Sequence, residues 1–95
     1  MQSIKGHEAA IIEMVKKYGF GQPKIGSLAS IEIVVDGVDI ILMVSVSESS
    51  GYFELVQLED ELTQLLGIHI DVCTEQMIPA NDRPKVLESL IPIIA

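Results

Sequence analysis

Apolar residues recur along this chain at two spacings, one typical of helices and the other typical of strands. Apolar positions three and four residues apart predict helices over residues 7–18 and 52–66, and a third helix that begins near Pro84. Short apolar runs rich in β-branched residues predict strands at 24–25, 31–35, 38–46 and 68–74. The expected order of elements is therefore α, β, β, β, α, β, α.

Turn and capping residues set the expected boundaries of these elements. Gly21-Gln22-Pro23 predicts a turn, and Asp36-Gly37 predicts a two-residue hairpin turn between the strands at 31–35 and 38–46. The last helix is expected to end at Pro92, because proline cannot continue a helix. Its buried side chains should be Val86, Leu87, Leu90 and Ile91.

The helix predicted over 52–66 has the clearest pattern in the chain. Gly67 is a natural C-cap for it, because glycine adopts the left-handed backbone conformation without strain. Glu59-Asp60-Glu61 is interpreted as part of the solvated side of this helix rather than as a metal site. The expected buried stripe consists of Leu55, Leu58, Leu62 and Leu65.

Two of the predicted strands each carry a carboxylate where a core strand should have none. They are Asp39, which shares a strand face with Ile41, and Asp71, which shares a face with His69 and Cys73. A lone buried charge costs several kcal/mol unless it is paired, binds a metal or reaches solvent at a strand end, and each of these explanations remains open. Zinc is disfavoured, because three ligands side by side on one strand are poorly placed for a tetrahedron.

Length and composition limit the fold class. Ninety-five residues, 48% of them apolar, predict one domain covering residues 1–95, with one core and some apolar surface left for a partner or for a homodimer. Strands interleaved with helices predict an α/β (α+β) fold, in which one sheet has its helices packed mainly on one face.

The charge of the chain excludes some partners. A formal net charge of −8 argues against a broad nucleic-acid surface, since phosphate binding needs clustered Lys and Arg, whereas a basic protein would be attracted. No apolar run approaches the roughly 20 residues that span a bilayer, so no membrane association is expected. The single Cys73 agrees with a reducing compartment, and the expected location is cytoplasmic.

Four features occur together in this sequence: Gly26-Ser27 at a strand end, Asp39 at the start of a long strand, a helix ending in Leu65-Leu66-Gly67, and Asp71 on a later strand. Their order resembles the minimal nucleotidyltransferases, relatives of DNA polymerase β that are found beside HEPN proteins in toxin–antitoxin pairs. The resemblance runs over nearly the whole chain and implies a nucleotidyltransferase-like mixed sheet. It assigns Gly26 and Ser27 to nucleotide binding, and Asp39 and Asp71 to catalysis and metal binding.

The sequence departs from the family pattern at two places. The family carries Asp-x-Asp, and ungapped spacing from Ile41 through Phe53 to Asp71 assigns the second aspartate to Ile41. Relatives also carry Ala-Arg-Gly after Gly-Ser, where this chain has Ala29-Ser30-Ile31, so an arginine that could lie near phosphates is missing.

The resemblance implies a Mg²⁺-dependent transfer of a nucleotide from ATP, and the departures weaken that expectation. Magnesium needs near-octahedral oxygen ligands, and Ile41 supplies none. One hypothesis is therefore an antitoxin that binds and neutralises a HEPN-type ribonuclease toxin, with nucleotidyl transfer weakened or lost. The alternative is an active transferase that moves AMP from Mg-ATP to a partner protein. An unrelated small acidic α/β domain is the third reading.

Overall fold

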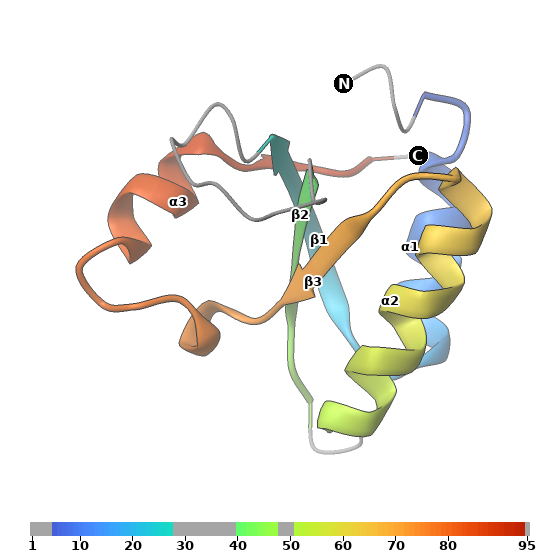
Figure 1. The fold of residues 1–95 in the computed structure, drawn as a ribbon, viewed down its shortest axis with the longest axis horizontal. Coiled ribbons are helices and arrows are strands. Elements are labelled where there is room, and N and C mark those ends of the chain that lie inside the picture. Colours follow the sequence, from blue (N-terminus) through green and yellow to red (C-terminus); the bar gives the residue numbers. More distant parts are fainter. Residues whose placement is uncertain (1–4, 28–39, 48–50, 95) are drawn as a thin grey trace.

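The computed structural model of the protein describes residues 5–27, 40–47 and 51–94, and within these residues a mixed sheet separates the helices (Figure 1). The strands lie in the order β3-β2-β1-β4. β1 is antiparallel to both of its neighbours, and β2 and β3 are parallel. The strands are β1 (Gly21–Ser27), β2 (Ile40–Ser45), β3 (Ile70–Cys73) and β4 (Ile91–Pro92). The helices are α1 (Glu8–Lys17), α2 (Tyr52–Leu66) and α3 (Arg83–Ser89), with a short 3-10 turn, η3 (Glu75–Met77).

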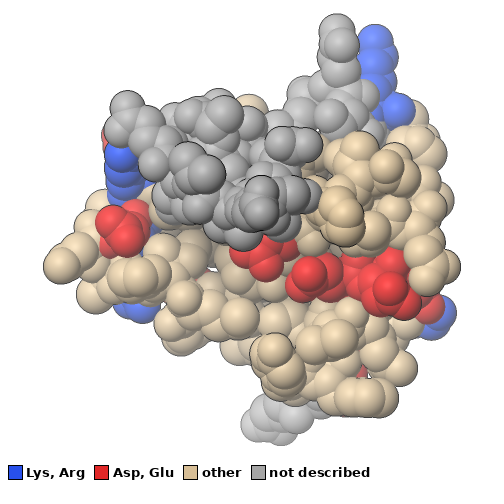
Figure 2. All heavy atoms as spheres, viewed as in Figure 1, with Lys and Arg blue, Asp and Glu red and all other residues tan. Residues whose placement is uncertain are grey.

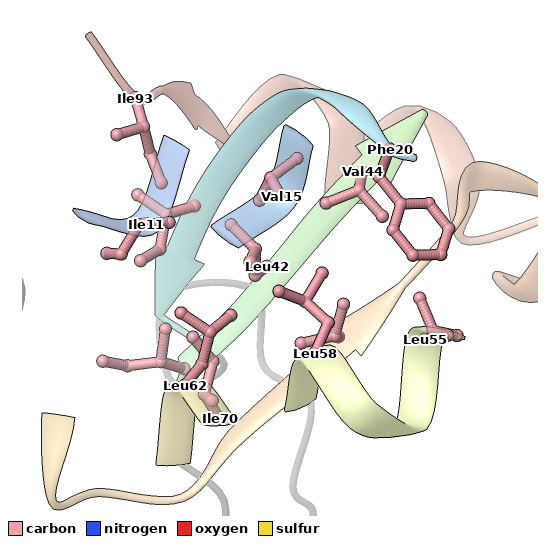
Figure 3. Close-up of a cluster of buried hydrophobic side chains, with 13 residues drawn as sticks. Ile11, Val15, Phe20, Leu42, Val44, Leu55, Leu58, Leu62, Ile70 and Ile93 are labelled. Carbon is pink, nitrogen blue, oxygen red and sulfur yellow. The ribbon is translucent and has the colours of Figure 1, made fainter. Parts of the chain in front are cut away.

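The two longer helices cover one face of the sheet and α3 covers the other, so the predicted mixed α+β architecture is confirmed (Figure 1). Figure 3 shows the larger cluster of buried side chains, in which Leu58 and Leu62 of α2 lie against Leu42 of β2. α1 contributes Ile11 and Val15 to the same cluster. Burial of these side chains is the main source of stability for a chain of this size, because helices and strands of this length are marginal alone.

Side chains of β2 alternate between two buried clusters, as their spacing predicts. Ile40, Leu42 and Val44 belong to the larger cluster on the α1 and α2 side. Ile41 and Met43 belong to a second cluster on the α3 side. Helices cover both faces of β2, so its side chains are apolar on both faces.

The predicted bounds of α2 are confirmed at both ends. The helix begins after Gly51, whose backbone N–H donates to the Glu54 carboxylate at 3.1 Å. It ends at Gly67, which has a φ of 70° and donates its N–H to the carbonyl of Thr63 at 2.9 Å. On the side toward α1, Tyr18 donates a hydrogen bond to the Glu61 carboxylate at 2.5 Å, so Glu61 joins the two helices.

The structure differs from the sequence-based expectation at Gly21-Gln22-Pro23 and at the C-terminal end. The expected turn is instead the irregular start of β1, with Gln22 at a φ of 47° and a shift in the pairing with β2. α3 ends at Ser89, and Ile91 pairs with Ile25 of β1 and is 65% exposed rather than buried in the helix. Ile91 precedes a proline, which disfavours the helical conformation.

The predicted strand at 31–35 and its Asp36-Gly37 turn lie outside the described residues. Among the residues that the structure describes, no helix is long and apolar enough to cross a membrane.

Candidate functional site

The site expected from the sequence is centred on a row of three residues that crosses the sheet. Gly26 of β1 is paired with Ile41 of β2, and Ile41 is paired with Asp71 of β3. Adjacent strands lie roughly 4.8 Å apart, so this pairing brings the glycine, the isoleucine and the aspartate together. The sequence reasoning placed these three residues in one site, and the register of the strands agrees with that placement. The functional roles expected for Gly26 and Asp71 at this site stay predictions.

The centre of this row is apolar and closed. Ile41 is only 5% exposed and lies in the cluster on the α3 side of the sheet. The other buried members of that cluster are Met43, Cys73, Ile78, Val86 and Leu90. The position that the family motif assigns to a second aspartate is therefore part of the contact between the sheet and α3.

Gly26 has a packing role in this structure. A Cβ atom at Gly26 would lie 2.8 Å from Cδ2 of Leu90 and 3.9 Å from Cγ2 of Ile41, so the space above the glycine is taken by the side chain that follows α3. A close approach between chain segments is a common reason for glycine in a strand. The nucleotide-binding roles expected for Gly26 and Ser27 stay predictions.

Replacing Gly26 by alanine is expected to lower the free energy of unfolding by about 1–2 kcal/mol, because the new methyl group overlaps the end of the Leu90 side chain. Urea unfolding followed by circular dichroism measures this cost. Gly26→Ala should cost less in a Leu90→Val background than in the wild type, because the shorter side chain at position 90 leaves room for the new methyl group. Equal costs of Gly26→Ala in the two backgrounds would contradict the proposed contact.

Asp71 lies at the edge of the row, half-buried, with a second carboxylate nearby. Burial raises the pKa of Asp71 above its ordinary value. Burial first, and then repulsion by Asp71, raise the pKa of Glu59, which projects from α2. Figure 2 shows acidic side chains gathered in a band across this side of the molecule, over β3 and α2.

Glu59 corrects one part of the sequence interpretation, which placed it on the solvated side of the helix. It is partly buried, whereas its neighbour Asp60 is exposed. Its spacing contains the signal that could have found it, because Glu59 lies four residues after Leu55 and three before Leu62, at the border of the buried stripe.

Replacing Glu59 by glutamine is expected to raise the free energy of unfolding at pH 7. Because the pKa of Glu59 is raised in the folded state, its protonated carboxyl stabilises the fold. This contribution is complete at pH values below the ordinary pKa of 4.5, and it is lost as the pH rises through the raised pKa of the folded state. The variant should therefore lose less stability than the wild type between pH 4 and pH 7 in urea titrations. The control is Asp60→Asn on the exposed side; equal changes in both variants would contradict a specific Glu59–Asp71 repulsion.

The remaining candidate ligands do not form a metal site in the described part of the chain. Asp39, expected to be catalytic and metal-binding, lies outside the described residues. Within residues 5–27, 40–47 and 51–94, no three His, Cys, Asp or Glu side chains gather closely enough to hold a metal ion. His69 is exposed, whereas Cys73 is buried, and burial raises the pKa of the Cys73 thiol to about 12.

Comparison with solved structures shows that the fold is that of minimal nucleotidyltransferases. A structure described as a candidate minimal nucleotidyltransferase superimposes with a TM-score of 0.75 at 19% identity, covering 96% of this chain and 93% of the other. The fold class predicted from the motif order is thereby confirmed.

Two further structures with the same fold come from toxin–antitoxin systems. One is a toxin–antitoxin solved with AMP-PNP, with a TM-score of 0.69 and 13% identity, covering 94% of this chain and 73% of that chain. The other is a mutant of the MntA-HpeT toxin–antitoxin, with a TM-score of 0.68 and 10% identity, covering the same shares. No protein-family model matches the sequence, and no curated protein matches it. The structural likeness therefore establishes the fold.

Proposed function

We propose that this protein is a nucleotidyltransferase-fold antitoxin that binds and neutralises a HEPN-type ribonuclease toxin, with nucleotidyl transfer weakened or lost. The observation that carries the proposal is the buried Ile41 in the middle of the row formed by Gly26, Ile41 and Asp71. A chain that keeps the fold while filling the second-acid position with a packed hydrocarbon side chain is better suited to binding than to catalysis.

The described residues do not fit the Mg²⁺ and ATP that the family resemblance implies. Two-metal nucleotidyl transfer needs several carboxylate oxygens around the ions, whereas Ile41 offers none and is packed beneath α3. Of the three residues in the row, only Asp71 offers carboxylate oxygens. The described residues of the row therefore supply too few oxygen ligands for two-metal catalysis.

Two kinds of observation support a protein partner. Solved structures with this fold are described as toxin–antitoxin systems, which makes a toxin the natural partner to test. The chain itself carries a net charge of −8 and exposes large apolar side chains, and both features suit a basic protein partner with an apolar contact surface.

The proposal is tested by asking whether a gene beside this one encodes a HEPN-type protein, and by expressing that protein alone and together with this chain. Growth arrest by the HEPN protein alone, relieved by the wild-type chain, is the expected result. The Asp71→Ala variant should relieve the arrest equally well, because neutralisation by binding does not need the carboxylate. Persisting growth arrest in the presence of the wild-type chain would contradict the antitoxin function.

The alternative is an active transferase that moves AMP from Mg-ATP to its partner, and the fold neighbour solved with AMP-PNP makes nucleotide binding worth measuring. Under the binding proposal, calorimetry with millimolar ATP and Mg²⁺ should give no heat, and mass spectrometry should find no AMP on the partner. Addition of AMP that is abolished by Asp39→Ala would overturn the binding-only proposal and support the enzyme.

A further inference from the structure

The N-terminal part of α2 presents large apolar side chains to solvent. Tyr52 is 74% exposed, Phe53 is 70% exposed and Val56 is 47% exposed, although all three lie within the first two turns of one helix. Aromatic side chains are costly to leave in water and are enriched at the centres of protein interfaces. Leu55 and Leu58 on the other side of the helix already fill the core, so the exposed residues are not needed there.

This apolar surface continues into an open groove with an acidic wall. The groove is lined by Tyr52, Val56, Glu59, Asp60, Thr63 and His69. Residues four apart lie on one side of a helix, so Tyr52, Val56 and Asp60 form a continuous stripe that changes from apolar to acidic. The acidic band in Figure 2 lies over α2 and β3 on the same side of the molecule.

We propose that this face of α2, formed by Tyr52, Phe53, Val56, Glu59 and Asp60, is the docking surface for a cationic, amphipathic segment of the toxin. This inference rests on the proposed function and names the face and the chemistry of its occupant. The apolar side of the segment would cover the aromatic residues, and its Lys or Arg side chains would lie beside the carboxylates of Glu59 and Asp60.

Charge decides between this occupant and a second copy of the chain. Two copies that met through this face would bring like charges together on molecules that each carry −8, which disfavours the pairing. A cationic segment instead gains attraction from the same carboxylates.

The test measures binding of the intact chain to a purified HEPN-type protein, together with relief of the growth arrest that this protein causes. Phe53→Ser should weaken binding by about tenfold or more, and Asp60→Lys by about fivefold or more. Raising the salt concentration should weaken binding of the wild type and have less effect on Asp60→Lys. Matched controls are Met77→Ser, at a side chain that is 52% exposed on η3, and Glu88→Lys, on the exposed side of α3.

The controls should bind within about threefold of the wild type, and circular dichroism should show that all four variants are folded. Wild-type binding and neutralisation that neither Phe53→Ser nor Asp60→Lys weakens would overturn the docking surface and leave the proposed function standing. A wild-type chain that does not bind the HEPN-type protein would overturn both. A dimer of the chain alone that Phe53→Ser dissociates would assign the face to a second copy.

Discussion

Replacing Ile41 by aspartate is expected to lower the free energy of unfolding by about 4 kcal/mol. The substitution removes a side chain that is 5% exposed from the cluster beneath α3 and places a carboxylate among Met43, Val86 and Leu90. Lost packing of a buried isoleucine costs about 2–5 kcal/mol, and burial of a polar group without a partner adds to that cost. Urea unfolding at pH 7, followed by circular dichroism, measures the difference.

The control for this prediction is Ile41→Val, which keeps the apolar character and should cost about 1 kcal/mol. The aspartate variant also tests whether the row across the sheet can accept a metal. If Ile41→Asp were as stable as the wild type, or gained several kcal/mol from millimolar Mg²⁺, the α3 side of the sheet would be open to ions and the binding-only function would lose its main support.

Replacing Leu62 by alanine is expected to cost about 3 kcal/mol of stability. Leu62 is fully buried between α2 and the sheet and belongs to the larger cluster (Figure 3). The substitution removes apolar contacts and leaves a cavity that the surrounding strands can only partly fill. The change in the urea midpoint, at an unchanged slope, gives the free energy.

Leu65→Ala is the matched control, since Leu65 lies on the same helix and is only partly buried. It should cost about 1 kcal/mol, because less apolar surface returns to water. Similar costs for the two leucines would contradict the buried stripe that α2 presents to the sheet. Both variants keep the helix propensity high, so the comparison isolates burial.

Local patterns in the sequence were sufficient for much of the fold. α2 was predicted at its observed bounds because a regular leucine spacing and a glycine cap act within one segment. The two faces of β2 were predicted because alternation requires no knowledge of the partner strands. The motif order assigned Gly26, Ile41 and Asp71 to one site, and the structure pairs them across the sheet, whereas their roles stay predictions.

Features that depend on distant partners were not predicted. The segment after α3 pairs with β1, so its strand depends on a partner from a distant part of the chain. The helical spacing of Glu59 indicates its partial burial, but its interaction with Asp71 could not be predicted, because Asp71 lies on another element. The catalytic and metal-binding roles expected for Asp39 stay predictions, since this residue lies outside the described residues.

The pairing of Ile25 with Ile91 joins segments from opposite parts of the chain, whereas α2 connects the adjacent strands β2 and β3 within one continuous stretch. Contacts between distant segments require closure of a long loop, which costs more conformational entropy than closure of a short one. During refolding, the β2-α2-β3 unit should therefore gain protection from hydrogen exchange first. The amide of Ile93, which donates to the carbonyl of Pro23 at 2.9 Å, should be among the last to become protected.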